Sequence, residues 1–220
     1  MEVNVKLGYQ SLYDDYGYYI DKVPKDILNE LKIPINELKN DFKLGTPYNS
    51  ELAGEIKQEY TIPFPPKFQS YLKELVSKTE KESNYMKVFF PNSSRLAFDS
   101  LWVNFQRKYE YQPLHFHSGI WSFVVWYQIP YTREEEVQYS AKHKVATEKI
   151  QRPIQSGNFS FIYSKMVSPI EQTRVELDLI IDKSKEGYIA MFPSTLEHIV
   201  YPFYTSHEYR ITVAGNIKTY

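Results

Sequence analysis

The sequence predicts a mainly β fold of the α+β class, in which an antiparallel β-sandwich or barrel is supported by N-terminal helices. Three observations lead to this expectation. Apolar residues repeat with helical spacing through about the first third of the chain, the period changes to two near residue 87, and aromatic residues make up 16% of the chain. Because 220 residues suit one all-β domain, we expect a single domain, with helical support over residues 1–86 and a β core over residues 87–220.

The helical part contains three expected helices. The first begins at Pro24, because proline suits the first turn of a helix. A short second helix is capped by Ser50 and carries Leu52 and Ile56 on its inner face. The third opens at Pro65, and its apolar side consists of Phe68, Leu72, Leu75 and Val76.

The β part is indicated by alternation of apolar and polar residues. In the first strand, the side chains of Leu101, Val103 and Phe105 point to one face and those between them to the other. A charged segment, residues 132–152, interrupts the pattern and is expected as a solvated excursion, with a mobile lid as the alternative. The expected strands cover residues 101–106, 114–129, 158–163, 188–192, 198–203 and 209–217.

Composition and charge exclude several classes of protein. Lys plus Arg number 26 and Asp plus Glu number 27, so no general positive charge attracts nucleic acid or an anionic membrane. The chain has no cysteine, which leaves histidine, carboxylates or water to hold any metal. The apolar, uncharged stretch of most concern as a membrane span, residues 120–131, is shorter than the ~20 residues of a membrane-spanning helix, and we expect no signal sequence at the N-terminus. We therefore expect a soluble, cytoplasmic protein of unpredicted oligomeric state.

Three histidines and one arginine are the candidate functional residues. His115 and His117 are two residues apart on an expected strand, so both rings can project from one face toward one ion, or form a surface or hydrogen-bonded pair. His198 precedes a short apolar strand and by itself suits a structural role. Arg210 shares a strand face with Thr212, and a guanidinium beside a hydroxyl suits capture of a carboxylate, although a surface arginine is the simpler interpretation when it is taken alone.

The order of these motifs resembles a known family. It is similar to that of the Fe(II)/2-oxoglutarate-dependent oxygenases, in particular of their small bacterial and phage-type branch. The tryptophan-rich strand of that branch corresponds to Leu101–Gln106 and its paired-histidine motif to His115–Pro130. Its late Phe-Pro-Ser…His…Pro block corresponds to Phe192–Pro202 and its Arg-x-Thr strand to Arg210–Asn216. This resemblance spans about residues 48–217 and implies a double-stranded β-helix, or jelly-roll, core. It is also compatible with a phage-encoded protein that acts in an infected host.

The resemblance implies a role for each motif residue. It makes His115 and His198 ligands of Fe(II), Arg210 the partner of the distal carboxylate of 2-oxoglutarate, and Thr212 the hydroxyl beside it. His117 stands where most of the superfamily has Asp or Glu, so the expected third ligand is also an imidazole. Two alternatives for the third position remain. One is a water or anion held by His117, and the other is a carboxylate from Asp99, Glu110 or Glu197.

The implied activity is that of a dioxygenase, which uses O2 to hydroxylate an unidentified small-molecule or peptide substrate while 2-oxoglutarate is decarboxylated to succinate. Trp102, Asn104 and Tyr127 are candidates for the cosubstrate pocket, and core packing is their alternative role.

Two other classes of protein compete with this interpretation. A cupin needs a glutamate shortly after its histidine pair, and residues 120–122 are Ile, Trp and Ser. A non-enzymatic β-sandwich that serves as a binding or virion-associated module is the other alternative.

Overall fold

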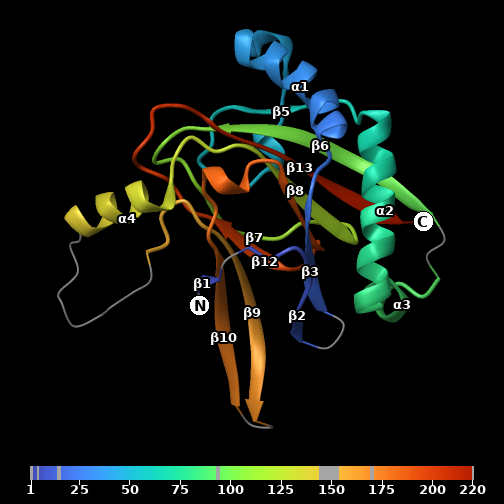
Figure 1. Ribbon diagram of the computed structural model, residues 1–220. Coiled ribbons are helices and arrows are strands. Elements are labelled where there is room, and N and C mark those ends of the chain that lie inside the picture. The colour runs from blue at the N-terminus through green and yellow to red at the C-terminus, as the bar shows by residue number, and fades with distance from the viewer. Residues whose placement is uncertain are drawn as a thin grey trace.

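The computed structural model describes residues 2–3, 5–13, 16–92, 95–143, 154–168 and 171–219. In this part of the chain most residues in regular structure belong to two sheets, which confirms the mainly β class (Figure 1). The larger sheet has the strand order β2-β3-β11-β8-β13-β6-β5-β4, and the smaller has the order β1-β10-β9-β12-β7. Neighbouring strands pair antiparallel, except that β1 pairs parallel with β10. The sheets do not close into a barrel.

The elements have the following bounds. The helices are α1 (Lys25–Asn40), α2 (Pro66–Ser83), α3 (Tyr85–Phe89) and α4 (Arg133–Lys142), with short 3-10 turns at Phe42–Leu44, Asn49–Glu51 and Lys183–Lys185. The strands are β1 (Glu2–Val3), β2 (Gly8–Tyr13), β3 (Tyr16–Lys22), β4 (Thr46–Pro47), β5 (Glu59–Thr61), β6 (Leu96–Gln106), β7 (Gln112–His115), β8 (Trp121–Gln128), β9 (Phe159–Ser168), β10 (Glu171–Leu179), β11 (Tyr188–Pro193), β12 (Glu197–Val200) and β13 (Arg210–Thr219).

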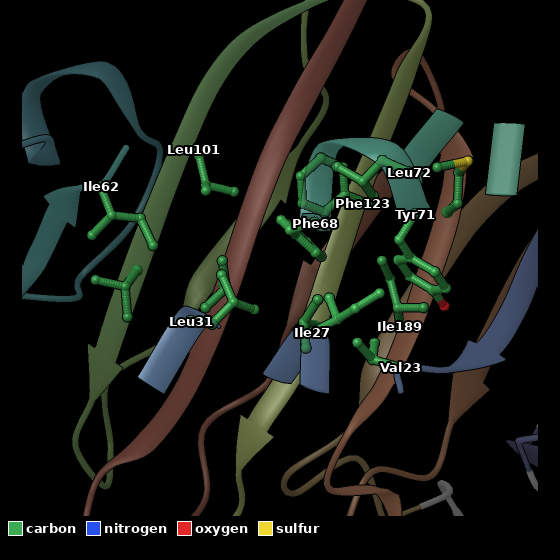
Figure 2. Close-up of a cluster of buried hydrophobic side chains, with 14 of the residues drawn as sticks. Val23, Ile27, Leu31, Ile62, Phe68, Tyr71, Leu72, Leu101, Phe123 and Ile189 are labelled. Atoms are coloured by element: carbon green, nitrogen blue, oxygen red, sulfur yellow. The ribbon is translucent and has the colours of Figure 1, made fainter. Parts of the chain in front are cut away.

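Helices α1 and α2 cover one face of the larger sheet and form the main apolar core with it. Figure 2 shows Ile27 and Leu31 of α1 and Phe68 of α2 against the sheet residue Phe123, and all four are buried. The expected first and third helices are thus confirmed, and α1 continues through Pro34 to Asn40. The alternation in β6 is also confirmed, because its odd-numbered residues 101–105 join this core. The even-numbered residues therefore face the smaller sheet.

Three sequence predictions about regular structure are wrong. The helix expected after Ser50 is only a 3-10 turn, because the backbone is already extended at Leu52 (φ −117°, ψ 145°) and Glu55 donates its backbone N–H to the carbonyl of Tyr111. The strand expected over 114–129 is two strands in different sheets, separated at Gly119, whose φ of 117° suits glycine. The expected division at residue 87 also differs from the structure, because β2, β3 and β5 belong to the larger sheet.

The charged segment begins with an anchored helix. Thr132 and Glu135 form a capping box that starts α4, and the Glu136 carboxylate is fully buried. It accepts hydrogen bonds from the backbone N–H groups of Tyr204 and Thr205 at 2.9–3.1 Å. The part described, up to residue 143, is therefore packed against the body of the protein instead of forming a solvated excursion. The lid interpretation for the remainder of 132–152 concerns residues outside those described.

Among the described helices, none combines the length and the apolar character needed to cross a membrane.

Candidate metal centre

Three histidines, two from neighbouring strands of the smaller sheet and one from the loop after β7, lie together. His115 ends β7, and the strand register places it directly opposite His198 of β12. His117 follows two residues later, where its backbone N–H donates to the carbonyl of Ser194 at 2.8 Å. The ring centroids are 4.1 Å apart for His115 and His198, and His117 is 5.0 and 5.1 Å from them. The potential ligand atoms of all three lie within 4.8 Å of one another, close enough to share one ion.

Hydrogen bonds leave two of the three rings ready to bind a metal. The Nδ1 atom of His115 lies 2.7 Å from the carbonyl oxygen of Pro113, and that of His198 lies 2.9 Å from the carbonyl oxygen of Leu196. Because a carbonyl oxygen only accepts, Nδ1 is the protonated nitrogen in both rings and Nε2 keeps its lone pair. The two rings are therefore held in the tautomer that binds a metal through Nε2.

Burial keeps the three imidazoles neutral. Removal from water lowers the pKa of His115 and lowers that of His198 well below its ordinary value. For His117, removal from water is the larger cause and electrostatic repulsion from His115 the smaller, and together they lower its pKa to about 4. Phe159 stacks on the His198 ring at 5.3 Å and Phe192 meets it edge-on at 5.0 Å, which accounts for part of this burial. Three neutral imidazoles are a donor set that suits a divalent ion such as Fe(II).

The carboxylates considered for the third position lie elsewhere. Asp99 pairs with Lys218 at 2.9 Å, Glu110 accepts from the backbone N–H of Arg107, and Glu197 is 3.8 Å from Arg174. Within the described residues, the group with metal-binding geometry at this point consists of the three histidines, with no acidic member. The structure thus favours His117 over these carboxylates at the third position.

A buried arginine lies in the same cavity as the histidines. Arg210 begins β13 and is only 2% exposed. Its five N–H groups all have protein acceptors. Nε and Nη2 donate to Oε1 of Gln106 at 2.9 and 2.6 Å, Nη1 donates to the Tyr131 hydroxyl at 2.7 Å and to the Gly157 carbonyl at 2.9 Å, and Nη2 also donates to the Tyr201 carbonyl at 2.9 Å.

None of these acceptors of Arg210 is a carboxylate. Burial raises the pKa of Tyr131, so its hydroxyl stays protonated and donates to the Gly157 carbonyl at 3.0 Å. A buried positive charge with only neutral partners is costly, and an anion that enters the cavity offsets it. This environment fits the distal carboxylate of 2-oxoglutarate, provided that the anion replaces one of the neutral acceptors.

The other expected pocket residues have different positions. Thr212, Asn104 and Trp102 line the cavity, and the Asn104 Nδ2 donates to the Thr212 hydroxyl at 3.1 Å. Tyr127 is not brought to the cavity, because it packs with the helix-side core, and Trp126, one residue earlier, lines the cavity instead.

Two residues whose side chains contact Arg210 were not among the candidates predicted from the sequence. Gln106 follows Trp102 and Asn104 on the same face of β6, so the two-residue period was a usable signal for it. Tyr131 follows the end of β8, where no periodic pattern indicates which way its ring points.

Comparisons with known proteins agree with this geometry. The model of the family described as "Putative 2OG-Fe(II) oxygenase" matches residues 100–216. Two similar solved structures are a prolyl-4-hydroxylase from Pseudomonas putida, with 13% identity, 92% of each chain covered and a TM-score of 0.53, and the viral collagen prolyl hydroxylase of Paramecium Bursaria Chlorella virus-1 in its 2OG complex, with 11% identity, 91% of this chain and 94% of that chain covered and a TM-score of 0.48. No curated protein matches the sequence.

These findings confirm the fold and the family. At these identities a structural likeness shows the fold alone, and that fold is the oxygenase jelly roll. The family match is a separate finding, since it covers more than half of the chain and includes the three histidines and Arg210. On this match, the chain belongs to the 2OG-Fe(II) oxygenase family, whose members use Fe(II) and 2-oxoglutarate.

Proposed function

We propose that the protein is a 2-oxoglutarate-dependent dioxygenase that hydroxylates a small-molecule or peptide substrate. The observation that carries this proposal is the meeting of three neutral imidazoles, with ligand atoms within 4.8 Å, in a cavity that also holds the buried Arg210. His115, His117 and His198 hold the Fe(II), and Arg210 with Thr212 holds the distal carboxylate of 2-oxoglutarate. When bound, the iron and 2-oxoglutarate together activate O2 for insertion of one oxygen atom into a C–H bond of the substrate and supply the electrons by decarboxylation to succinate.

The protein's own residues orient the reactants and exclude water. The backbone carbonyls of Pro113 and Leu196 hold the rings of His115 and His198 in one orientation, so that little reorganisation accompanies binding. Arg210 fixes the far end of 2-oxoglutarate and thereby sets the direction of its near end. Buried aromatic side chains complete a dry wall, formed by Trp126, Phe159 and Phe192.

Anaerobic titration tests the proposal without knowledge of the substrate. Fe(II) is added first and 2-oxoglutarate second, and the visible charge-transfer band of an iron-chelated 2-oxo acid is recorded. We expect the band to saturate at one 2-oxoglutarate per chain in the wild-type protein and to be lost in His198→Ala. Absence of the band and of Fe(II) binding in the wild-type protein would refute the proposal and favour the non-enzymatic binding module.

A further inference from the structure

Two buried polar atoms in the metal cavity have no hydrogen-bond partner among the described residues. They are Nε1 of Trp102 and Oδ1 of Asn104, whose residues are 3% and 5% exposed. Both residues line the cavity that contains the histidines and Arg210. Native proteins pair nearly all of their buried polar groups, so an unpaired donor and an unpaired acceptor side by side on one strand indicate a ligand that supplies both partners.

The neighbours of Asn104 show which chemistry its oxygen requires. Nδ2 of its amide donates to the Thr212 hydroxyl, which directs Oδ1 to a different partner. Oδ1 can only accept a hydrogen bond, and the carboxylates and the keto group of 2-oxoglutarate can also only accept one. The cosubstrate therefore cannot satisfy this atom, which needs an N–H or O–H donor from another molecule.

Trp102 lies at the metal end of the same row of side chains. Along β6 the row runs from Gln106, which contacts Arg210, through Asn104 to Trp102. The indole ring of Trp102 lies 5.7 Å from the ring of His117 and 5.4 Å from that of Tyr48. A group that accepts from its Nε1–H is therefore close to the metal centre, where the substrate must bind to be oxidised.

We propose that the primary substrate presents an amide group, as a peptide bond or a carboxamide, to Trp102 and Asn104. Its N–H donates to Oδ1 of Asn104, and its carbonyl accepts from Nε1 of Trp102. One amide supplies the donor and the acceptor that the pair lacks, in a neutral group that adds no second negative charge beside 2-oxoglutarate. This inference rests on the proposed function and assigns to the substrate two residues that we expected to serve the cosubstrate.

Nuclear magnetic resonance tests the proposal with two small probes. The protein is labelled with 15N and loaded with Zn(II), which is diamagnetic and supports no turnover, and 2-oxoglutarate is then added to saturation. The chain has 3 tryptophans, so the indole signal of Trp102 is assigned as the one lost in Trp102→Phe. The probes are N-methylacetamide and methyl acetate, which have the same shape and differ in the N–H group that Asn104 is proposed to accept.

We expect N-methylacetamide to shift the Trp102 indole signal downfield and to bind at least tenfold more tightly than methyl acetate. In Asn104→Leu the two probes should bind equally. Equal binding of both probes to the wild-type protein, followed by any signal that the probes shift, would overturn the inference, and this comparison of affinities uses the wild-type protein alone. A second result would also overturn the inference: 2-oxoglutarate alone shifts the Trp102 indole signal, and Trp102→Phe and Asn104→Leu each require tenfold more 2-oxoglutarate for saturation. Trp102 and Asn104 would then bind the cosubstrate. Failure of the proposed function is a separate result, namely that 2-oxoglutarate does not bind the metal-loaded protein.

Discussion

Replacement of Gln106 by Glu tests how Arg210 recognises its anion. Oε1 of Gln106 accepts two of the five hydrogen bonds that the guanidinium donates, and it is neutral. A glutamate at this position gives Arg210 an internal carboxylate, which competes with the distal carboxylate of 2-oxoglutarate. A hydrogen bond to a charged group contributes about 1.5–3 kcal/mol, so we expect the concentration of 2-oxoglutarate needed for half-saturation to rise about 10- to 150-fold.

The assay is the anaerobic charge-transfer titration, with Gln106→Leu as the matched control. Both variants lose the hydrogen bond that Nε2 of Gln106 donates to the Glu110 carbonyl, so their difference isolates the added charge. Thermal unfolding with and without 2-oxoglutarate is a second readout. In Gln106→Leu, two N–H groups of Arg210 lose their acceptor, so 2-oxoglutarate should raise the melting temperature more than it does in the wild-type protein. In Gln106→Glu, 2-oxoglutarate should raise the melting temperature less than it does in the wild-type protein. If both variants titrate like the wild-type protein, Arg210 does not bind the cosubstrate and our interpretation of its surroundings is wrong.

Three further predictions concern residues around the site. Burial raises the pKa of Glu59 to about 7. The wild-type protein should therefore lose up to about 3 kcal/mol of unfolding free energy relative to Glu59→Gln as the pH rises from 4.5 to 8. An unfolding free energy that changes equally with pH in both proteins would contradict this prediction. Glu136→Ala leaves buried donors of residues 204–205 unpaired and should cost about 3 kcal/mol in urea unfolding, whereas a cost below 1 kcal/mol would show that α4 is not anchored there. Tyr127→Phe should leave the titration with 2-oxoglutarate unchanged, and a tenfold weaker response would place Tyr127 in the cavity.

The sequence predicted those parts of the fold that depend on local periodicity. The apolar faces of α1 and α2 and the alternation in β6 and β13 are visible in the chain itself, because each side chain's direction follows from the helix or strand period. The pairing of His115 with His198 was not visible in this way. It depends on the register of β7 against β12, which joins residues 83 positions apart, and only the resemblance to a family indicated it.

The missed features depend on contacts that no local pattern encodes. The strand expected over 114–129 divides at Gly119, and the separation puts the histidines in one sheet and β8 in the other. Glu136 occurs in a run of three glutamates that looks solvated, yet it alone meets a set of backbone N–H groups from a distant loop. Tyr127 was a candidate for the cavity, but it packs with the helix-side core.

The proposed metal centre requires that three imidazoles hold one iron. The decisive measurement is anaerobic equilibrium binding of Fe(II) to the wild-type protein and to His115→Ala, His117→Ala and His198→Ala, with circular dichroism as the check of folding. We predict one Fe(II) per wild-type chain and a loss of affinity of about a hundredfold or more in each variant, with His117→Ala as impaired as the other two. Binding of iron by His117→Ala as tight as that by the wild-type protein would contradict the three-histidine centre.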